Sequence, residues 1–248
     1  MPRSVIYQKL DSEGGECCQM KVRHPFTLAT KAIPRLALRP ENTALVIQDF
    51  QEYFTNRSIG FGKTAKERGI QREFESYYQQ VERAKEHLPV LCQRAREFHM
   101  PILFTRWAYE HPMEISMLQR AIGAMIPTTD SAAQIDPALK ANADELVITK
   151  PGLGAFSSAC FAEALKVRGI ENLLLTGVMT EFGIRNTAQV AADSGYRVII
   201  VHDCCAGVTL DSHRIATAEM TFGTIKVRGS REMGLIFDDL EREDVVLV

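Results

Sequence analysis

The chain has 248 residues, of which 46% are hydrophobic and 24% are charged, so it is long enough to bury the core of one large domain. Its net charge of −2 gives no electrostatic reason to bind nucleic acid or an anionic membrane surface. The sequence contains no apolar run of about 18 residues and no N-terminal signal region, so we expect a cytoplasmic protein without a membrane span.

After residue 40, apolar runs of strand length alternate with segments that repeat at helical spacing. Runs of Val, Ile and Leu without polar alternation are typical of parallel strands buried on both faces. The pattern predicts an α/β protein with three αβα layers and a Rossmann-like parallel sheet of about six strands. Strands are expected over residues 42–50, 101–107, 144–150, 171–178 and 197–203, and helices over 72–99, 112–126, 157–169, 181–195 and 211–225. Pro89 is expected to kink or divide the first of these helices.

The alternation also sets the expected domain boundaries. Residues 1–40 lie outside it and are interpreted as an N-terminal extension, either a hairpin or an arm that packs on a neighbouring subunit. Residues 41–248 form one domain, whose last residues change from acidic to apolar and are compatible with an edge strand.

Polar side chains stand where three of the predicted strands end. The first strand ends in Asp49, the third ends in Lys150, and the fourth runs into the tip Thr176–Gly183. Ligand sites of open parallel sheets lie beyond the carboxyl ends of the strands. An acid and a lysine that share a pocket there shift each other's pKa. The alternative interpretation is a helix cap or a surface salt bridge.

Residues near these strand ends are predicted to contact a small-molecule substrate. Trp107 either lines the pocket or fills the core, and Glu181 is either a second acid or base or a favourable charge at the start of a helix. The predicted substrate-binding residues are Gln51, Phe54, Trp107, Phe156, Met179, Thr180 and Glu181.

Nothing in the sequence predicts a cofactor. The segment Gly152-x-Gly154-x-x-Ser157 lacks the third glycine of a dinucleotide-binding loop. The six cysteines have no C-x-x-C spacing, which favours reduced and mostly buried thiols.

Three segments, 44–51 (ALVIQDFQ), 148–156 (ITKPGLGAF) and 173–207, resemble the isochorismatase-like hydrolase superfamily, in the right order. The resemblance implies that Asp49 and Lys150 are catalytic and that the usual cysteine nucleophile falls on Gly183. It also implies a cis peptide bond between Val178 and Met179, and a homo-oligomer, either a dimer or a tetramer. The metal motif of the nicotinamidase type is absent after the second strand, so we expect no metal.

A glycine at this position is also found in the true isochorismatases, which cleave a vinyl ether by acid catalysis and need no thiol. The resemblance therefore favours a hydrolase of a small, anionic substrate in which Asp49 is a general acid or base and Lys150 orients the substrate. The tip departs from the isochorismatase pattern, because Met179, Thr180 and Glu181 precede the glycine. One alternative is an amide hydrolase with a relocated nucleophile, for which the candidates are Cys160, Cys204 and Cys205. The other is an inactive, ligand-binding member of the family.

Overall fold

The computed structural model describes residues 37–221, 224–240 and 246–247. The predicted N-terminal arm lies almost entirely outside these residues. From residue 37 the chain forms β1 (Ala37–Leu38), which pairs antiparallel with β8 (Val246–Leu247). Among the described residues, no helix combines the length and the apolar character that crossing a bilayer requires.

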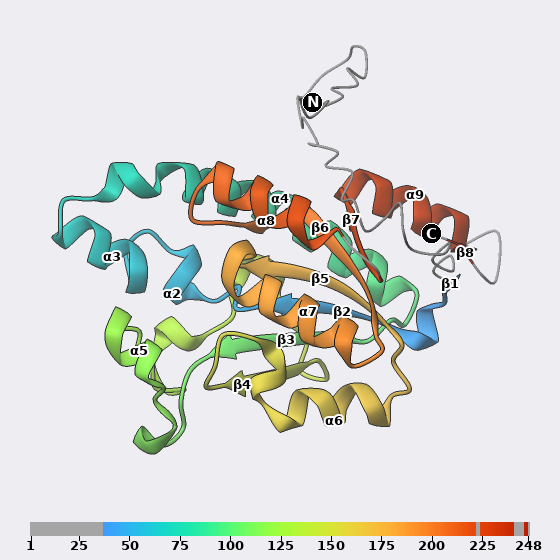
Figure 1. The fold of residues 1–248 in the computed structure, drawn as a ribbon, viewed down its shortest axis with the longest axis horizontal. Coiled ribbons are helices and arrows are strands. Elements are labelled where there is room, and N and C mark those ends of the chain that lie inside the picture. Colours follow the sequence, from blue (N-terminus) through green and yellow to red (C-terminus); the bar gives the residue numbers. More distant parts are fainter. Residues whose placement is uncertain (1–36, 222–223, 241–245, 248) are drawn as a thin grey trace, which may run out of the picture.

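A six-stranded sheet forms the centre of the protein, in the order β4-β3-β2-β5-β6-β7 (Figure 1). Every neighbouring pair in it is parallel. The five strands expected from the sequence are all present, and a short sixth strand lies at one edge. The strands are β2 (Thr43–Gln48), β3 (Ile102–Trp107), β4 (Leu146–Lys150), β5 (Asn172–Val178), β6 (Arg197–Ala206) and β7 (Ile225–Arg228).

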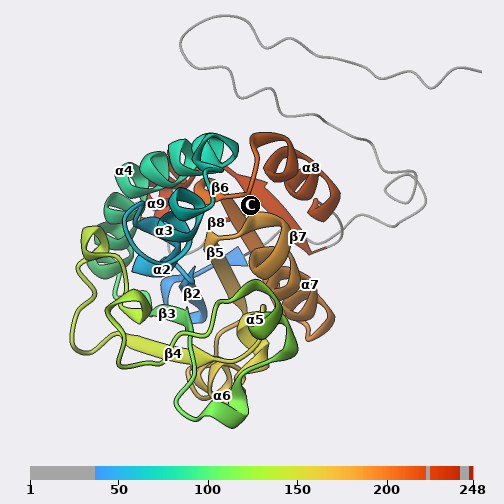
Figure 2. The same cartoon turned by 90° about the vertical axis from the view of Figure 1, so that its left-hand side faces the viewer.

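Helices cover both faces of the sheet, which confirms the predicted three-layer α/β fold (Figure 2). One face packs against α4 (Glu75–Glu97) and α9 (Ser230–Leu240). The other face packs against α6 (Ala159–Val167), α7 (Arg185–Asp193) and α8 (Leu210–Met220). Alternate strand residues enter the two cores, as Leu45 and Val46 do in β2. This double burial explains the continuous apolar runs of the sequence.

Short elements gather at the carboxyl ends of the strands, at the left of Figure 1, where α2 (Glu52–Thr55), α3 (Gly60–Glu67) and α5 (Met117–Ile122) lie. The chain leaves β2 on one side toward β3, and β5 is the neighbour of β2 on the other side. The crevice between β2 and β5 is therefore the topological switch point at which α/β sheets bind ligands. The 3-10 turns are Pro40–Asn42, Gln71–Phe74, Pro112–Glu114, Ser131–Ala133, Pro137–Leu139 and Ala155–Ser157.

Two helix predictions need correction. Pro89 does not divide α4, which is one continuous helix, because buried residues on both sides of the proline, such as Leu88 and Cys92, hold a single apolar face against the sheet. The helix expected from residue 181 begins instead as a π-helical turn, Thr180–Ile184, and becomes α-helical at Arg185. Such turns are rare and occur frequently at functional sites.

Candidate active site

Asp49 follows the last residue of β2 and is buried, with 4% of its surface exposed. Its φ of +52° is unusual for a residue other than glycine and indicates local backbone strain. The backbone N–H of Asp49 donates to the carbonyl of Thr105 at 3.0 Å, and the Thr105 hydroxyl donates to Asp49 Oδ1 at 3.0 Å. The neighbouring strand β3 thus fixes both the backbone and the carboxyl of Asp49.

Lys150 ends β4 and has no exposed surface. Its Nζ lies 2.7 Å from Asp49 Oδ2 and donates to the carbonyls of Gly152 and Leu153, each at 2.8 Å. It also lies 5.8 Å from the centre of the Trp107 ring, within the range of a cation–π contact. The structure therefore brings together the two residues that the sequence placed at separate strand ends.

Burial is the largest influence on this pair. It raises the pKa of the Asp49 carboxyl above its ordinary value, against the opposing effects of Lys150, Thr105 and Gln48. It lowers the pKa of the Lys150 ammonium, against the opposing effect of Asp49. Both shifts are toward the neutral carboxyl and amine, and two groups this close titrate as a unit.

Gly183 is buried within the π-helical turn that follows β5. The cis peptide bond that the resemblance implies is present between Val178 and Met179, directly before this turn. A Cβ atom on Gly183 would lie 2.3 Å from Gln48 Nε2 and 3.0 Å from the Leu153 carbonyl oxygen. The space that a side chain at position 183 would take is therefore occupied by the Gln48 carboxamide and the Leu153 carbonyl.

Thr180 and Glu181 are turned toward α8. The Thr180 hydroxyl shares a 2.8 Å hydrogen bond with His213 Nδ1, and Glu181 Oε1 accepts from the N–H of Val208 at 2.9 Å. Glu181 Oε2 is buried and has no hydrogen-bond partner among the described residues. Glu181 therefore anchors the segment between β6 and α8, which the sequence did not predict. Met179 packs against the core on the α4 side of the sheet.

Gln51, Phe54 and Trp107 form a second group beside Lys150. Gln51 Oε1 accepts from the N–H of Trp107 at 2.7 Å, and Gln51 Nε2 donates to the carbonyls of Trp107 and Ala132, each at 3.3 Å. The ring of Phe54 stacks on that of Trp107 at 6.1 Å. Trp107 Nε1 donates to the Pro151 carbonyl at 2.9 Å. This group supports the Lys150 side of the site.

Phe156 lies elsewhere. Its ring packs against Phe161 at 5.0 Å and Tyr196 at 6.0 Å, and these contacts belong to the core on the α6 and α7 side of the sheet. The structure does not bring this ring to Asp49, so a substrate contact by Phe156 stays a prediction without structural support.

Two of the three candidate nucleophilic thiols, Cys204 and Cys205, are buried, which disfavours the ionised form that attacks a substrate. Burial raises the pKa of both the Cys204 and Cys205 thiols, and Cys205 Sγ donates to the carbonyl of Val201 at 3.4 Å. Cys160 is exposed, near the start of α6.

Three polar residues of the site escaped the sequence analysis, namely Gln48, Thr105 and Thr187. Gln48 interrupts an apolar run directly before Asp49, and a buried amide there must find hydrogen-bond partners, which is a signal that the sequence does contain. Thr187 lies in α7, and its contact with Gln48 spans 139 positions of the chain, which no local pattern reveals.

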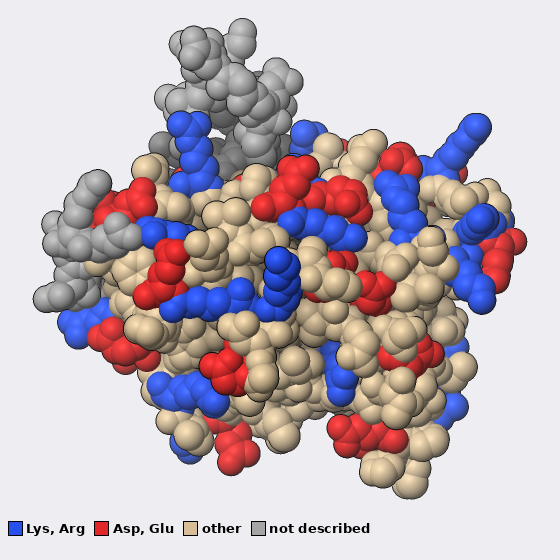
Figure 3. All heavy atoms as spheres, turned by 180° about the vertical axis from the view of Figure 1, so that it is seen from behind, with Lys and Arg blue, Asp and Glu red and all other residues tan. Residues whose placement is uncertain are grey.

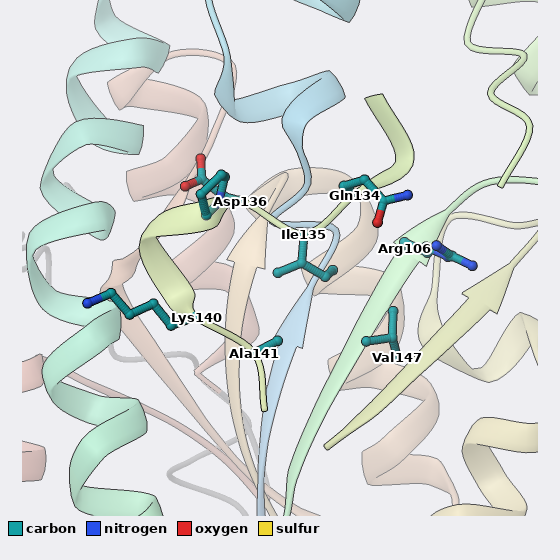
Figure 4. A pocket seen from close by; sticks show the side chains of 8 residues that line it. Arg106, Gln134, Ile135, Asp136, Lys140, Ala141 and Val147 are labelled. Carbon is teal, nitrogen blue, oxygen red and sulfur yellow. The ribbon is translucent and has the colours of Figure 1, made fainter. Parts of the chain in front are cut away.

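Two cavities lie near the carboxyl ends of the strands. The larger, about 540 Å³, is lined by α2, α3 and α5 and includes Tyr53, Phe61, Phe74, Arg68 and Arg120. The smaller, about 300 Å³, lies beside β4 and includes Arg106 and Lys140. Figure 4 shows these two cationic side chains pointing in opposite directions, so they do not converge on one ligand.

In the part of the chain that the structure describes, no group of three or more His, Cys, Asp and Glu side chains is arranged to hold a metal ion. Independence from metal stays a prediction, as do the cytoplasmic location and the homo-oligomeric state. On the face shown in Figure 3, Lys and Arg are interspersed with Asp and Glu.

The fold and the paired strand-end residues define an α/β protein with a buried acid–lysine site at the switch point of its sheet. The isochorismatase domain matches residues 43–231, and the chain belongs to the isochorismatase family of hydrolases. It is 26% identical over 203 residues to the uncharacterized isochorismatase family protein YecD of Escherichia coli O157:H7, covering 80% of this chain and 97% of that protein.

Two further comparisons show the breadth of the family. The chain is 27% identical over 136 residues to nicotinamidase 3 of Arabidopsis thaliana, covering 54% of this chain and 67% of that protein. Its fold matches the crystal structure of a cysteine hydrolase from Pseudomonas syringae pv. phaseolicola 1448A with a TM-score of 0.68 and 15% identity, over 85% of this chain and 99% of that one.

Proposed function

We propose that this protein hydrolyses a small, anionic substrate by proton transfer from Asp49, without a thiol nucleophile, in a reaction of the vinyl-ether type. The observation that carries the proposal is the buried Asp49–Lys150 pair, 2.7 Å apart, in a site where Gly183 stands at the nucleophile position and Gln48 fills the space of its side chain. Family members with a cysteine at this position attack the substrate covalently, and here the corresponding position can supply only backbone groups.

The electrostatics of the pair suit an acid. Because burial raises the pKa of Asp49, a larger share of its carboxyl groups carries a proton near neutral pH than for an exposed aspartate. The proton moves to the terminal vinyl carbon, the C=C electron pair forms the new C–H bond, and the ether oxygen stabilises the resulting cation. Water then adds to the cationic carbon and returns a proton to the Asp49 carboxylate. As the hemiketal collapses, its hydroxyl proton is transferred to the ether oxygen, the C–O bond to that oxygen breaks, and an alcohol and a ketone are released.

The anionic character of the substrate is supported by the cavity between α3 and α5. Two cationic residues, Arg68 and Arg120, line this cavity together with the aromatic residues Phe61 and Phe74. Aromatic rings connect this cavity with the catalytic pair. Tyr53 lines the cavity and packs edge-on against Phe54. Phe54 stacks on Trp107, whose ring lies beside Lys150. A carboxylate held by the arginines is the ligand that this lining fits best.

Amide hydrolysis by a relocated cysteine is the second candidate, and the similarity to a nicotinamidase favours it. The raised pKa values of the buried Cys204 and Cys205 thiols weigh against it, since the thiolate is the nucleophile. The third candidate function is ligand binding without turnover.

A turnover screen distinguishes these functions. The panel pairs vinyl ethers, with isochorismate among them, with small amides, and it is run on native protein and on protein alkylated with iodoacetamide. Our proposal predicts ether cleavage that survives alkylation. Amide cleavage that alkylation abolishes would establish a thiol mechanism instead, and tight binding without turnover of any compound would establish a binding role.

A further inference from the structure

Gln48, the last residue of β2, is fully buried, and each end of its carboxamide is held. Gln48 Oε1 accepts from the Thr187 hydroxyl at 2.6 Å, and Gln48 Nε2 donates to the Leu153 carbonyl at 2.9 Å. The same carbonyl accepts from Lys150 Nζ at 2.8 Å, and the Gln48 side chain lowers the pKa of the adjacent Asp49 carboxyl. One side chain thus links α7, the loop after β4 and the catalytic pair.

The held carboxamide stands where a side chain at position 183 would have to be. Real Cβ atoms essentially never approach another heavy atom to the 2.3 Å that separates Gln48 Nε2 from a Cβ built on Gly183. To make room, Gln48 would have to break its hydrogen bonds to Leu153 and Thr187. The buried carboxamide of Gln48 would then lack hydrogen-bond partners, which costs free energy.

We propose that Gln48 replaces the side chain at position 183 and acts as a positioning residue of the site. Its carboxamide closes the volume in which other members of the family carry a thiol, and it holds the Leu153 carbonyl to which Lys150 also donates. The steric part of this inference is independent of any reaction. The positioning part rests on the proposed function, because it concerns the acid that delivers the proton.

Substitutions at both positions test the steric part without an activity assay. Gly183→Ala should lower Tm by about 2 to 10 °C, because the methyl group meets a held side chain. The matched control is Gly234→Ala in α9, where a Cβ would meet nothing within 4 Å. The control should leave Tm unchanged or raise it, since alanine favours a helix over glycine.

The decisive comparison is the double variant. Gln48→Ala lowers Tm by itself because the Thr187 hydroxyl loses its acceptor. Adding Gly183→Ala to Gln48→Ala should then lower Tm by less than Gly183→Ala does in the wild type, since only the 3.0 Å contact with the Leu153 carbonyl oxygen remains. A Gly183→Ala protein as stable as the control would overturn the inference. So would an equal loss of Tm from Gly183→Ala in the presence and absence of Gln48.

Gln48→Leu tests the positioning part, because it keeps the bulk of the side chain and removes the amide donor. Because the Gln48 side chain lowers the pKa of the Asp49 carboxyl, loss of its amide should raise that pKa and move the alkaline limb of kcat/KM to higher pH. An unchanged limb would refute the positioning role while leaving the Tm comparison intact. Absence of turnover by every variant and by the wild type would count against the proposed function alone.

Discussion

The hydroxyl of Thr105 donates to Asp49 Oδ1 at 3.0 Å from the adjacent strand, while Lys150 occupies the other carboxyl oxygen at 2.7 Å. Both oxygens of the proposed acid therefore have a donor, in a site that excludes solvent. Each donor favours the carboxylate, and burial favours the protonated acid. The balance among them sets the pH range in which Asp49 can deliver a proton.

Thr105→Val should shift this balance. The variant loses the donor to Asp49, so the pKa of the carboxyl rises, and the alkaline limb of kcat/KM moves upward by about one pH unit or less. Thr149→Val is the matched control, because the Thr149 hydroxyl accepts from Arg106 Nε. A pH–rate profile of each protein makes the comparison, and equal profiles for wild type and Thr105→Val would contradict the assigned role of Thr105.

Lys150→Met should cost stability in a pH-dependent way. With its partner removed, Asp49 has a pKa that burial raises above the value near 4 of the unfolded chain. The protonated Asp49 therefore contributes its full stability below about pH 4, and this contribution is lost as the pH rises through the raised pKa of the folded state. We expect a loss of about 3–5 kcal/mol at pH 8 and a smaller loss at pH 5. Urea denaturation at both pH values measures this.

The control for that experiment is Lys63→Met, at an exposed position in α3. It should change the free energy of unfolding by less than about 1 kcal/mol at either pH. A loss in Lys150→Met that is the same at pH 5 and pH 8 would show that Asp49 does not take up a proton when its partner is removed.

Gln51→Ala should act on stability more than on substrate binding. The amide of Gln51 is fully used by the backbone of Trp107 and Ala132, and its removal leaves buried polar groups without partners. The expected loss is about 1–3 kcal/mol of unfolding free energy with a KM close to that of the wild type. A stable variant with a strongly raised KM would instead support the sequence-based expectation that Gln51 contacts substrate.

Arg120→Ala tests the anionic end of the substrate. Loss of its guanidinium from the cavity wall should raise KM by up to about tenfold and leave kcat nearly unchanged. Arg185→Ala is the control, since the Arg185 guanidinium pairs with Glu219 on α8. If the two variants have the same KM, the cavity does not hold the anionic group.

The sequence was sufficient for the main parts of the fold because the sheet is buried on both faces. Continuous apolar runs marked β2 to β6, and the final acids and bases of those runs marked Asp49 and Lys150. It did not reveal the short edge strand β7 or helix α9, which lie beyond the clear alternation.

The finer details of the site depend on contacts between distant segments. Gln48 fills the space beside Gly183, and Glu181 accepts a hydrogen bond from the N–H of Val208. Both contacts join segments that are far apart in the sequence, so no local pattern predicts them. Proximity in sequence is a weak guide as well, because Phe156 is close to Lys150 along the chain but packs against the core on the α6 and α7 side of the sheet.

The most direct measurement is the rate of vinyl-ether cleavage, with isochorismate as the first substrate, by wild type and Asp49→Asn. The amide of asparagine keeps the size of the side chain but cannot deliver the proton. Our account predicts that kcat/KM falls by at least about 10²-fold, with circular dichroism unchanged. An Asp49→Asn protein that cleaves the ether at the wild-type rate would contradict the proposal that Asp49 is the acid.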